Sequence, residues 1–180
     1  VRELGLVPEQ IGVVFALGNV GTLAGAVLAN RVSGWFGLGR TIIGSLFLSG
    51  FSVLLLALAP TSNPIPFLVA SGLVGGVAVM VYNINQVSYR QAICPPRMQG
   101  RMNATIRFLV WGTIPIGGVI GGLLATQFGL RQAIWIWAVL SFLPALPILL
   151  SPVRRLRSMP EPAGDEEVPA EAPSVETQPA

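Results

Sequence analysis

The polar side chains inside long apolar stretches of this sequence include Asn19, Tyr82, Asn83 and Gln86. Their amide and phenol groups can hydrogen-bond a solute or a neighbouring helix, but they are costly to bury in hydrocarbon without a partner. We therefore expect all four to face protein, water or a bound molecule, and we take them as candidates for the wall of a substrate path. Hydrogen bonding between helices, which contributes roughly 0.6 kcal/mol on average, explains the same residues without a substrate.

Acids and bases that could catalyse a reaction are missing from most of the chain. The sequence has no His and no Lys, and no Asp or Glu lies between Ile11 and Pro160. Hydrolysis inside a membrane needs a paired Asp, a His-containing metal site or an activated Ser, and these stretches offer no general base. The sequence therefore argues against an enzyme, and it predicts neither a metal site nor a cofactor.

The elements that must position the polar residues are five uncharged, apolar runs. Apolar residues make up 52% of the chain and charged residues 11%, whereas a soluble domain carries roughly 25% charged residues. A helix needs about 20 residues to cross about 30 Å of hydrocarbon. The runs that meet this length are 11–29, 41–59, 65–88, 108–128 and 133–150. They predict an all-α integral membrane protein, because helices buried in a soluble protein would have polar segments between them.

The arginines predict how these helices are oriented. All eleven basic residues are Arg, and nine of them share one side if the spans alternate in direction, leaving Arg2 and Arg131 on the other. Cytoplasmic loops carry an excess of positive charge, so the nine-arginine side and the C-terminus are predicted to be cytoplasmic. The use of Arg for every basic residue and the high content of Ala, Gly and Pro indicate a GC-rich bacterial genome, and we therefore expect a bacterial plasma membrane. The arginines flank apolar runs and form no single stripe, so they do not predict nucleic-acid binding.

Small residues and prolines predict how the helices pack. Glycines recur at helical spacing in three runs, at Gly18, Gly21 and Gly25, at Gly72 and Gly76, and at Gly117, Gly118, Gly121 and Gly122. Small residues let helices approach closely in lipid, so this pattern favours a compact bundle over pore-lining or hinge glycines. Proline removes a backbone donor, and we expect Pro115 to interrupt the fourth run and Pro144 and Pro147 the fifth. Arg107 either extends to the inner membrane surface, which we favour, or acts as a counter-charge for an anionic substrate.

The two ends of the chain differ from the apolar body. Residues 158–180 are rich in Pro, Glu and Ala without apolar periodicity, which predicts a disordered, acidic cytoplasmic tail. The chain begins with Val1, and no signal peptide leads its external N-terminus. We therefore expect an odd number of further spans before Val1, in an N-terminal half that is missing from this sequence.

Two connectors carry short motifs with Gly and Arg. The first contains Asn30, Arg31, Gly39 and Arg40, and the second contains Gly100 and Arg101. The first resembles the connector motif of the major facilitator superfamily, with Asn30 in place of the usual Asp. The second, where Pro precedes Gly-Arg, is also similar to that superfamily. The resemblance covers residues 1–157 and implies that the five spans are helices eight to twelve, most of the C-terminal six-helix half of a twelve-helix transporter.

What the resemblance implies is secondary active transport of a small-molecule substrate by alternating access. The overall sequence looks most like bacterial macrolide-efflux and enterobactin exporters, which implies proton-coupled efflux of a drug-like or siderophore-like molecule. No span carries an acid or His, so a proton-carrying residue would belong to the missing half. The implied partners are the lipid bilayer, the substrate and that half of the same protein. A non-transporting membrane scaffold or assembly factor stays open as an alternative, and a membrane-embedded enzyme is the least favoured.

Overall fold

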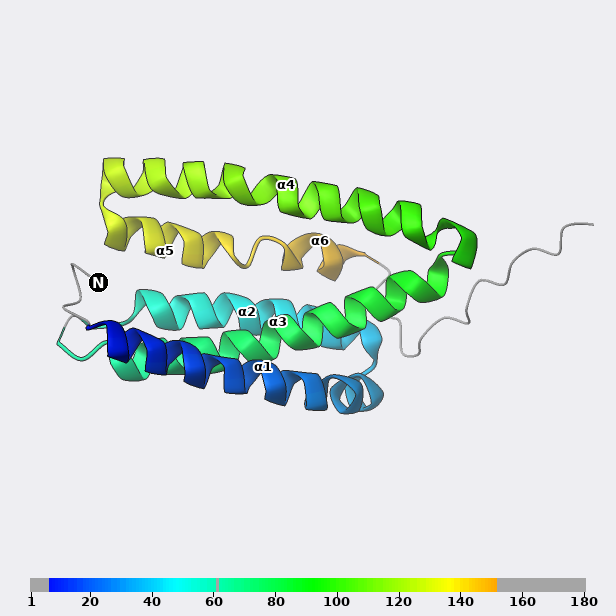
Figure 1. Ribbon diagram of the computed structural model, residues 1–180, viewed down its shortest axis with the longest axis horizontal. Coiled ribbons are helices and arrows are strands. Elements are labelled where there is room, and N and C mark those ends of the chain that lie inside the picture. Colours follow the sequence, from blue (N-terminus) through cyan, green and yellow to red (C-terminus); the bar gives the residue numbers. More distant parts are fainter. Residues whose placement is uncertain (1–6, 61, 152–180) are drawn as a thin grey trace, which may run out of the picture.

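The computed structural model describes residues 7–60 and 62–151, and within them every regular element is a helix. The helices are α1 (Pro8–Phe36), α2 (Leu38–Ala57), α3 (Ile65–Ile93), α4 (Pro96–Phe128), α5 (Leu130–Leu140) and α6 (Ala145–Leu150). They lie roughly parallel to one another in two groups, with α1, α2 and α3 on one side and α4, α5 and α6 on the other (Figure 1). The tail predicted at 158–180 lies outside the described residues.

Five helical stretches are long and apolar enough to cross a membrane, as the sequence predicts. They are α1, α2, α3, α4 and the stretch Leu130–Leu150, which contains both α5 and α6. These stretches lack charge and do not alternate polar and apolar residues as strands do. In hydrocarbon, a helix satisfies all of their backbone hydrogen-bonding groups within the stretch itself. The prediction of an all-α membrane fold is therefore confirmed.

The connectors are shorter than the sequence suggested. We expected links at 30–40 and 89–107, but α1 continues to Phe36, α3 continues to Ile93, and α4 begins at Pro96. A helix of 29 residues, such as α1 or α3, is about 43 Å long at 1.5 Å per residue, which exceeds about 30 Å of hydrocarbon. The polar arginine-bearing stretches are therefore helical extensions of the spans, because apolar length marks where a span crosses the hydrocarbon and not where its helix stops.

Two glycines reverse the chain where almost no connector is left. Gly37, between α1 and α2, and Gly129, between α4 and α5, both have a φ of 84°. Each donates its backbone N–H to a carbonyl of the preceding helix, Gly37 to Ser33 and Gly129 to Ala125, both at 3.0 Å. A positive φ of this size is strained for a residue with a Cβ, so glycine at these positions ends one helix and starts the next.

Glycines hold α1 directly against α3. A Cβ added at Gly18 would lie 3.4 Å from Cα of Gly72, and one added at Gly25 would lie 2.8 Å from the carbonyl oxygen of Val77. A Cβ added at Gly21 would overlap the carbonyl oxygen of Leu73. The predicted packing role of the glycines in the first and third spans is confirmed, because a Cβ at Gly18 would already be in contact with α3 and only a hydrogen fits at Gly21 and Gly25.

The glycines of the fourth span behave differently. A Cβ added at Gly117, Gly118 or Gly122 would meet no atom within 4 Å, and one added at Gly121 would lie 3.4 Å from Nε1 of Trp137 on α5. Among the described residues, α4 contains no buried side chain. The expectation that these four glycines lie in a close helix contact is therefore wrong at three of them within the described part of the chain.

The prolines act at one of the two expected places. The helix α4 continues through Pro115, so the interruption expected there is wrong. The fifth span does break, with α5 ending at Leu140 and α6 beginning after Pro144. The break places the Phe142 ring against α2, where it meets Gly50 and lies 6.0 Å from the Phe47 ring, centroid to centroid. The irregular turn therefore joins the two groups of helices.

Candidate functional site

The arginines that the structure describes gather at one end of the bundle. The junction of α1 with α2 and that of α3 with α4 lie at this end, and the end of α6 points the same way (Figure 1). Six of the seven described arginines lie within about three helical turns of these two junctions, namely Arg31, Arg40, Arg90, Arg97, Arg101 and Arg107. Arg131 follows the α4–α5 reversal at the opposite end. We refer to the first as the arginine-rich end.

The structure does not bring the four predicted path residues together. Asn19 is exposed on α1 and donates its Nδ2 to the Phe15 carbonyl, 3.0 Å away on the same helix. It neighbours Gly18, which packs against Gly72 of α3. Asn83 is eleven residues further along α3 than Gly72, which corresponds to about 16 Å of helix. Asn19 is therefore separate from the cluster on α3, and its own backbone contact satisfies one of its donors.

The polar cluster on α3 has its most buried member outside the predicted set. Asn83 is exposed, and Tyr82 and Gln86 are half-buried. Asn85, which shares a face with Tyr82 and Gln86 by helical spacing, is only 2% exposed and donates Nδ2 to the Val81 carbonyl at 2.9 Å. Its burial comes from packing with neighbouring helices, which the sequence alone does not show.

Two of the six connector motif residues line pockets, and the two pockets are different. Asn30, Arg31 and Arg101 are exposed, whereas Gly39 is buried at the start of α2. Arg40 lines a pocket among α1, α2 and α3, and Gly100 lines a pocket between α3 and α4. The two motifs that looked alike in sequence therefore have different surroundings.

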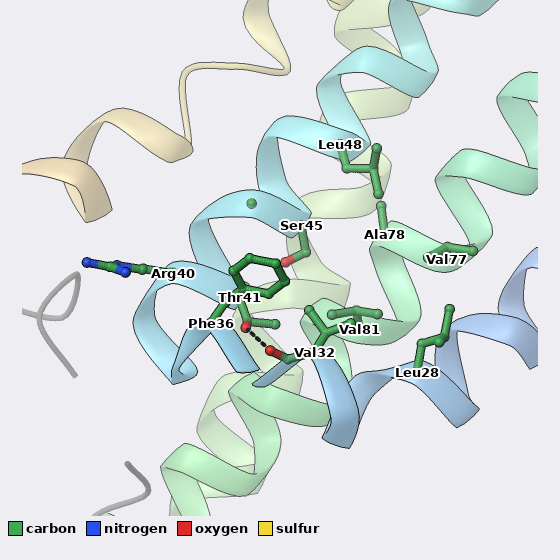
Figure 2. Close-up of a pocket in the computed structure, with 11 residues that line it drawn as sticks. Leu28, Val32, Phe36, Arg40, Thr41, Ser45, Leu48, Val77, Ala78 and Val81 are labelled. Carbon is green, nitrogen blue, oxygen red and sulfur yellow. Dashed lines mark hydrogen bonds between the residues drawn. The ribbon is translucent and has the colours of Figure 1, made fainter. Parts of the chain in front are cut away.

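The pocket among α1, α2 and α3 has a volume of about 310 Å³ and mainly aliphatic walls (Figure 2). The residues that line it are Leu28, Val32, Phe36, Arg40, Thr41, Gly44, Ser45, Leu48, Val77, Ala78 and Val81. Its two hydroxyls already have backbone partners: Thr41 donates Oγ1 to the Gly37 carbonyl at 2.8 Å, and Ser45 donates Oγ to the Ile42 carbonyl at 2.8 Å. The Arg40 side chain extends away from the aliphatic residues in Figure 2. This pocket suits an apolar group.

The pocket between α3 and α4 is larger and polar. It has a volume of about 640 Å³ and is lined by Val87, Arg90, Gln91, Gly100, Asn103, Ala104, Ile106 and Arg107. On α4 the spacing of Gly100, Asn103 and Arg107 places these residues along one helical face. Two guanidinium groups and two carboxamides therefore line one pocket, in the size range of sites for small molecules.

The corner between α3 and α4 is held by Gln99. Its Nε2 donates to the Gln91 carbonyl at 3.3 Å and to the Cys94 carbonyl at 3.4 Å. These bonds join the first turn of α4 to the last turn of α3, so the two helices leave a fixed corner and form the walls of the pocket.

The sequence interpretation missed Arg90. We counted it as one of the arginines that orient the spans, and considered only Arg107 as a counter-charge. In the structure two of the Arg90 nitrogens, Nε and Nη1, are buried and have no hydrogen-bond partner among the described residues. The spacing of Val87, Arg90 and Gln91, at i, i+3 and i+4, could have indicated that these residues share one face of the helix. The side chains in this pocket can bind and orient a polar molecule by hydrogen bonds and charge.

Comparison with known proteins identifies a family. The sequence profile of the Major Facilitator Superfamily matches residues 1–178. A "3-(3-hydroxy-phenyl)propionate transporter" of Escherichia coli (strain K12) is 27% identical to this chain over 157 residues, which cover 86% of this chain and 36% of that protein. The chain therefore spans about a third of the length of the curated relative that it matches. No solved structure matches it closely enough to be compared.

Proposed function

Because the chain belongs to the Major Facilitator Superfamily, we propose that this protein acts in secondary active transport and carries a small molecule across a membrane by alternating access. The observation that carries the proposal is the family match over residues 1–178, together with the five stretches long enough to span a bilayer. Membership of a transporter family also supports a role other than catalysis. The chain itself forms one pocket among α1, α2 and α3 and another between α3 and α4.

The proposal includes a place for these helices within the transporter. We assign them to helices eight to twelve, and we take an N-terminal half of the same protein as their partner. The similarity of the connector with Asn30, Arg31, Gly39 and Arg40 to the superfamily motif supports this assignment.

Orientation and location form a second part of the proposal. We place the protein in a bacterial plasma membrane with the arginine-rich end and the C-terminus in the cytoplasm. The arrangement of six described arginines at one end and Arg131 at the other supports this, since positive charge is retained on the cytoplasmic side. A reporter fused after Arg157 should be cytoplasmic and one inserted at Asn63 external, and both on one side would contradict the orientation.

The transported molecule has two candidate classes. The first is a drug-like or siderophore-like compound exported in exchange for protons, which the resemblance of the sequence to bacterial exporters supports. The coupling carboxylate would then come from outside residues 11–160, because that stretch contains none. The second is an aromatic acid, a class favoured by the printed function of the Escherichia coli relative.

Transport by the full-length protein in sealed vesicles tests both classes. With an imposed pH gradient, ethidium and radiolabelled 3-phenylpropionate are offered separately, and flux is compared with vesicles that lack the protein. Transport of ethidium alone supports drug-like export, and transport of the acid alone supports the second class. If a broad panel of cationic, neutral and anionic compounds shows no flux, the transport proposal fails and the scaffold alternative takes its place.

A further inference from the structure

We infer that the pocket between α3 and α4 is a binding site for a carboxylate, held by Arg90 and Arg107. The inference goes beyond transport, because the site can hold its ligand whether or not that ligand is carried across the membrane. Its starting point is the pair of guanidinium groups that line one pocket of about 640 Å³.

The charge of the two arginines has no counterpart among the described residues. These residues include one acid, Glu9, at the start of α1. That helix starts at the end of the bundle opposite the α3–α4 junction (Figure 1). Two cations in one pocket repel each other, and the buried nitrogens of Arg90 are costly unless an anion pairs with them, whereas Arg107 is exposed. An anion bound between Arg90 and Arg107 would remove both costs.

The hydrogen-bonding capacity of Arg90 points to the same ligand. Its Nε and Nη1 are both buried, and neither donates to a described residue. Each of these nitrogens forms, together with Nη2, one edge of the planar guanidinium, and the two parallel N–H groups on such an edge match the two oxygens of a carboxylate. The carboxamides of Gln91 and Asn103 line the same pocket and can donate to further oxygens.

The remaining lining residues define the rest of the ligand. Val87, Ala104 and Ile106 add aliphatic surface beside the polar groups, and Gly100 leaves the wall without a side chain. An organic acid with a small apolar body fits this combination better than inorganic phosphate, which would leave the aliphatic wall without a partner. The geometry therefore points to a carboxylate attached to a compact apolar group.

Such a carboxylate has two sources. One is a free organic acid. The other is the chain itself, because six acids lie between Glu161 and Glu176, and α6 leads toward the same end of the bundle as the α3–α4 junction (Figure 1). The chemistry is the same in both cases, and the experiment below distinguishes them.

Equilibrium binding to the purified full-length protein in phosphatidylcholine nanodiscs tests the inference. The probes are 3-phenylpropionate and its neutral amide, 3-phenylpropionamide, measured by calorimetry. We expect the acid to bind and the amide to bind at least about tenfold more weakly, because only the acid pairs with arginine. Arg90→Gln and Arg107→Gln should each weaken binding of the acid by about tenfold or more.

Matched controls separate the site from general charge effects. Arg97→Gln removes an exposed arginine in the first turn of α4 that does not line the pocket. This variant should change affinity by less than about twofold. Arg90→Lys keeps the charge without the two-nitrogen edge and should retain part of the affinity if Arg90→Gln fails to fold. A variant that ends at Ser158 should bind the acid more tightly if the acidic segment competes for the pocket, and equally if a free acid is the ligand.

Three results would overturn the inference. Equal affinity for 3-phenylpropionate and its amide would show that the negative charge of the ligand does not contribute to binding. Full affinity in a folded Arg90→Gln variant would remove the role of the buried guanidinium. Displacement of the acid by inorganic phosphate at equal concentration would identify a general anion site instead of a carboxylate site. A loss of transport with unchanged binding would concern the proposed function and leave this site intact.

Discussion

The helix α3 takes part in two contacts of opposite character. Its first half packs against α1 through Gly72 and Gly76, with backbone meeting backbone. Its last turns, from Val87 to Gln91, face α4 across a pocket of about 640 Å³. Apolar surface is no driving force for association within lipid, so a close contact has to come from residues small enough for helices to touch. Where α3 carries Arg and Gln in place of Gly, it cannot approach its neighbour closely, and space for a ligand results.

Leucine at Gly21 should produce the largest effect on the closely packed side of α3. A side chain here overlaps the Leu73 carbonyl, and backbone cannot move aside without separating α1 from α3. We expect Gly21→Leu to destabilise the protein by about 3 kcal/mol or more, at the upper end of overpacking costs. Thermal unfolding of the purified protein in detergent measures it.

The matched control for that substitution lies on α4. Gly118→Leu adds the same side chain where no atom of the described residues lies within 4 Å, and it should change stability by less than about 0.5 kcal/mol. Equal unfolding temperatures for the two variants would contradict the difference in packing between Gly21 on α1 and Gly118 on α4. A large loss at Gly118 alone would show that another helix covers this face of α4.

Loss of the Phe142 ring should have the next largest effect. The ring fills the space beside Gly50 and contacts Phe47, joining the broken fifth span to α2. Because Phe142 is half-buried, Phe142→Ala should cost about 1–3 kcal/mol, less than for a fully buried aromatic residue. The same unfolding measurement tests it, with Phe128→Ala, an exposed ring at the end of α4, as the control. Equal losses in both variants would show that the contact with α2 contributes nothing.

The pair Asn85 and Asn83 should distinguish packing from a solute path on α3. Asn85 is buried and bonded to the Val81 carbonyl, so Asn85→Ala should lower stability by about 1 kcal/mol. Asn83 is exposed, and Asn83→Ala should leave unfolding nearly unchanged. If Asn83 lines the path of a substrate, its alanine variant should instead lower transport in vesicles at equal protein content.

Cysteine labelling should have the smallest effect on stability, but it tests directly whether positions 83 and 86 line the substrate path. A cysteine at position 83 or 86 should react with a small aqueous thiol reagent from the arginine-rich side, and substrate should slow the reaction. The comparison is made in a protein with Cys94→Ser, because Cys94 is a free thiol near the same end. No labelling at either position, with full transport in both alanine variants, would leave only a structural role for these polar residues.

The amino-acid sequence by itself determined the number of membrane-spanning stretches and their helical character. Long uncharged runs can exist in hydrocarbon only with their backbone groups paired, and the helical spacing of Gly18, Gly21 and Gly25 predicts the close contact that α1 makes. These are local properties, and pattern alone predicts them. The ends of the helices were predicted less well, because apolar length does not mark where a helix stops in water.

Only the tertiary structure decided which polar side chains share a site. Asn19 and Asn83 look equivalent in sequence, yet the packing of α1 on α3 places them about 16 Å apart along the helix direction. Arg107 lies 17 positions after Arg90, and the two line one pocket because the chain reverses at Cys94 and Pro95 and Gln99 fixes the corner. Whether an arginine has a partner depends on every residue that folds around it, and no local pattern contains that information.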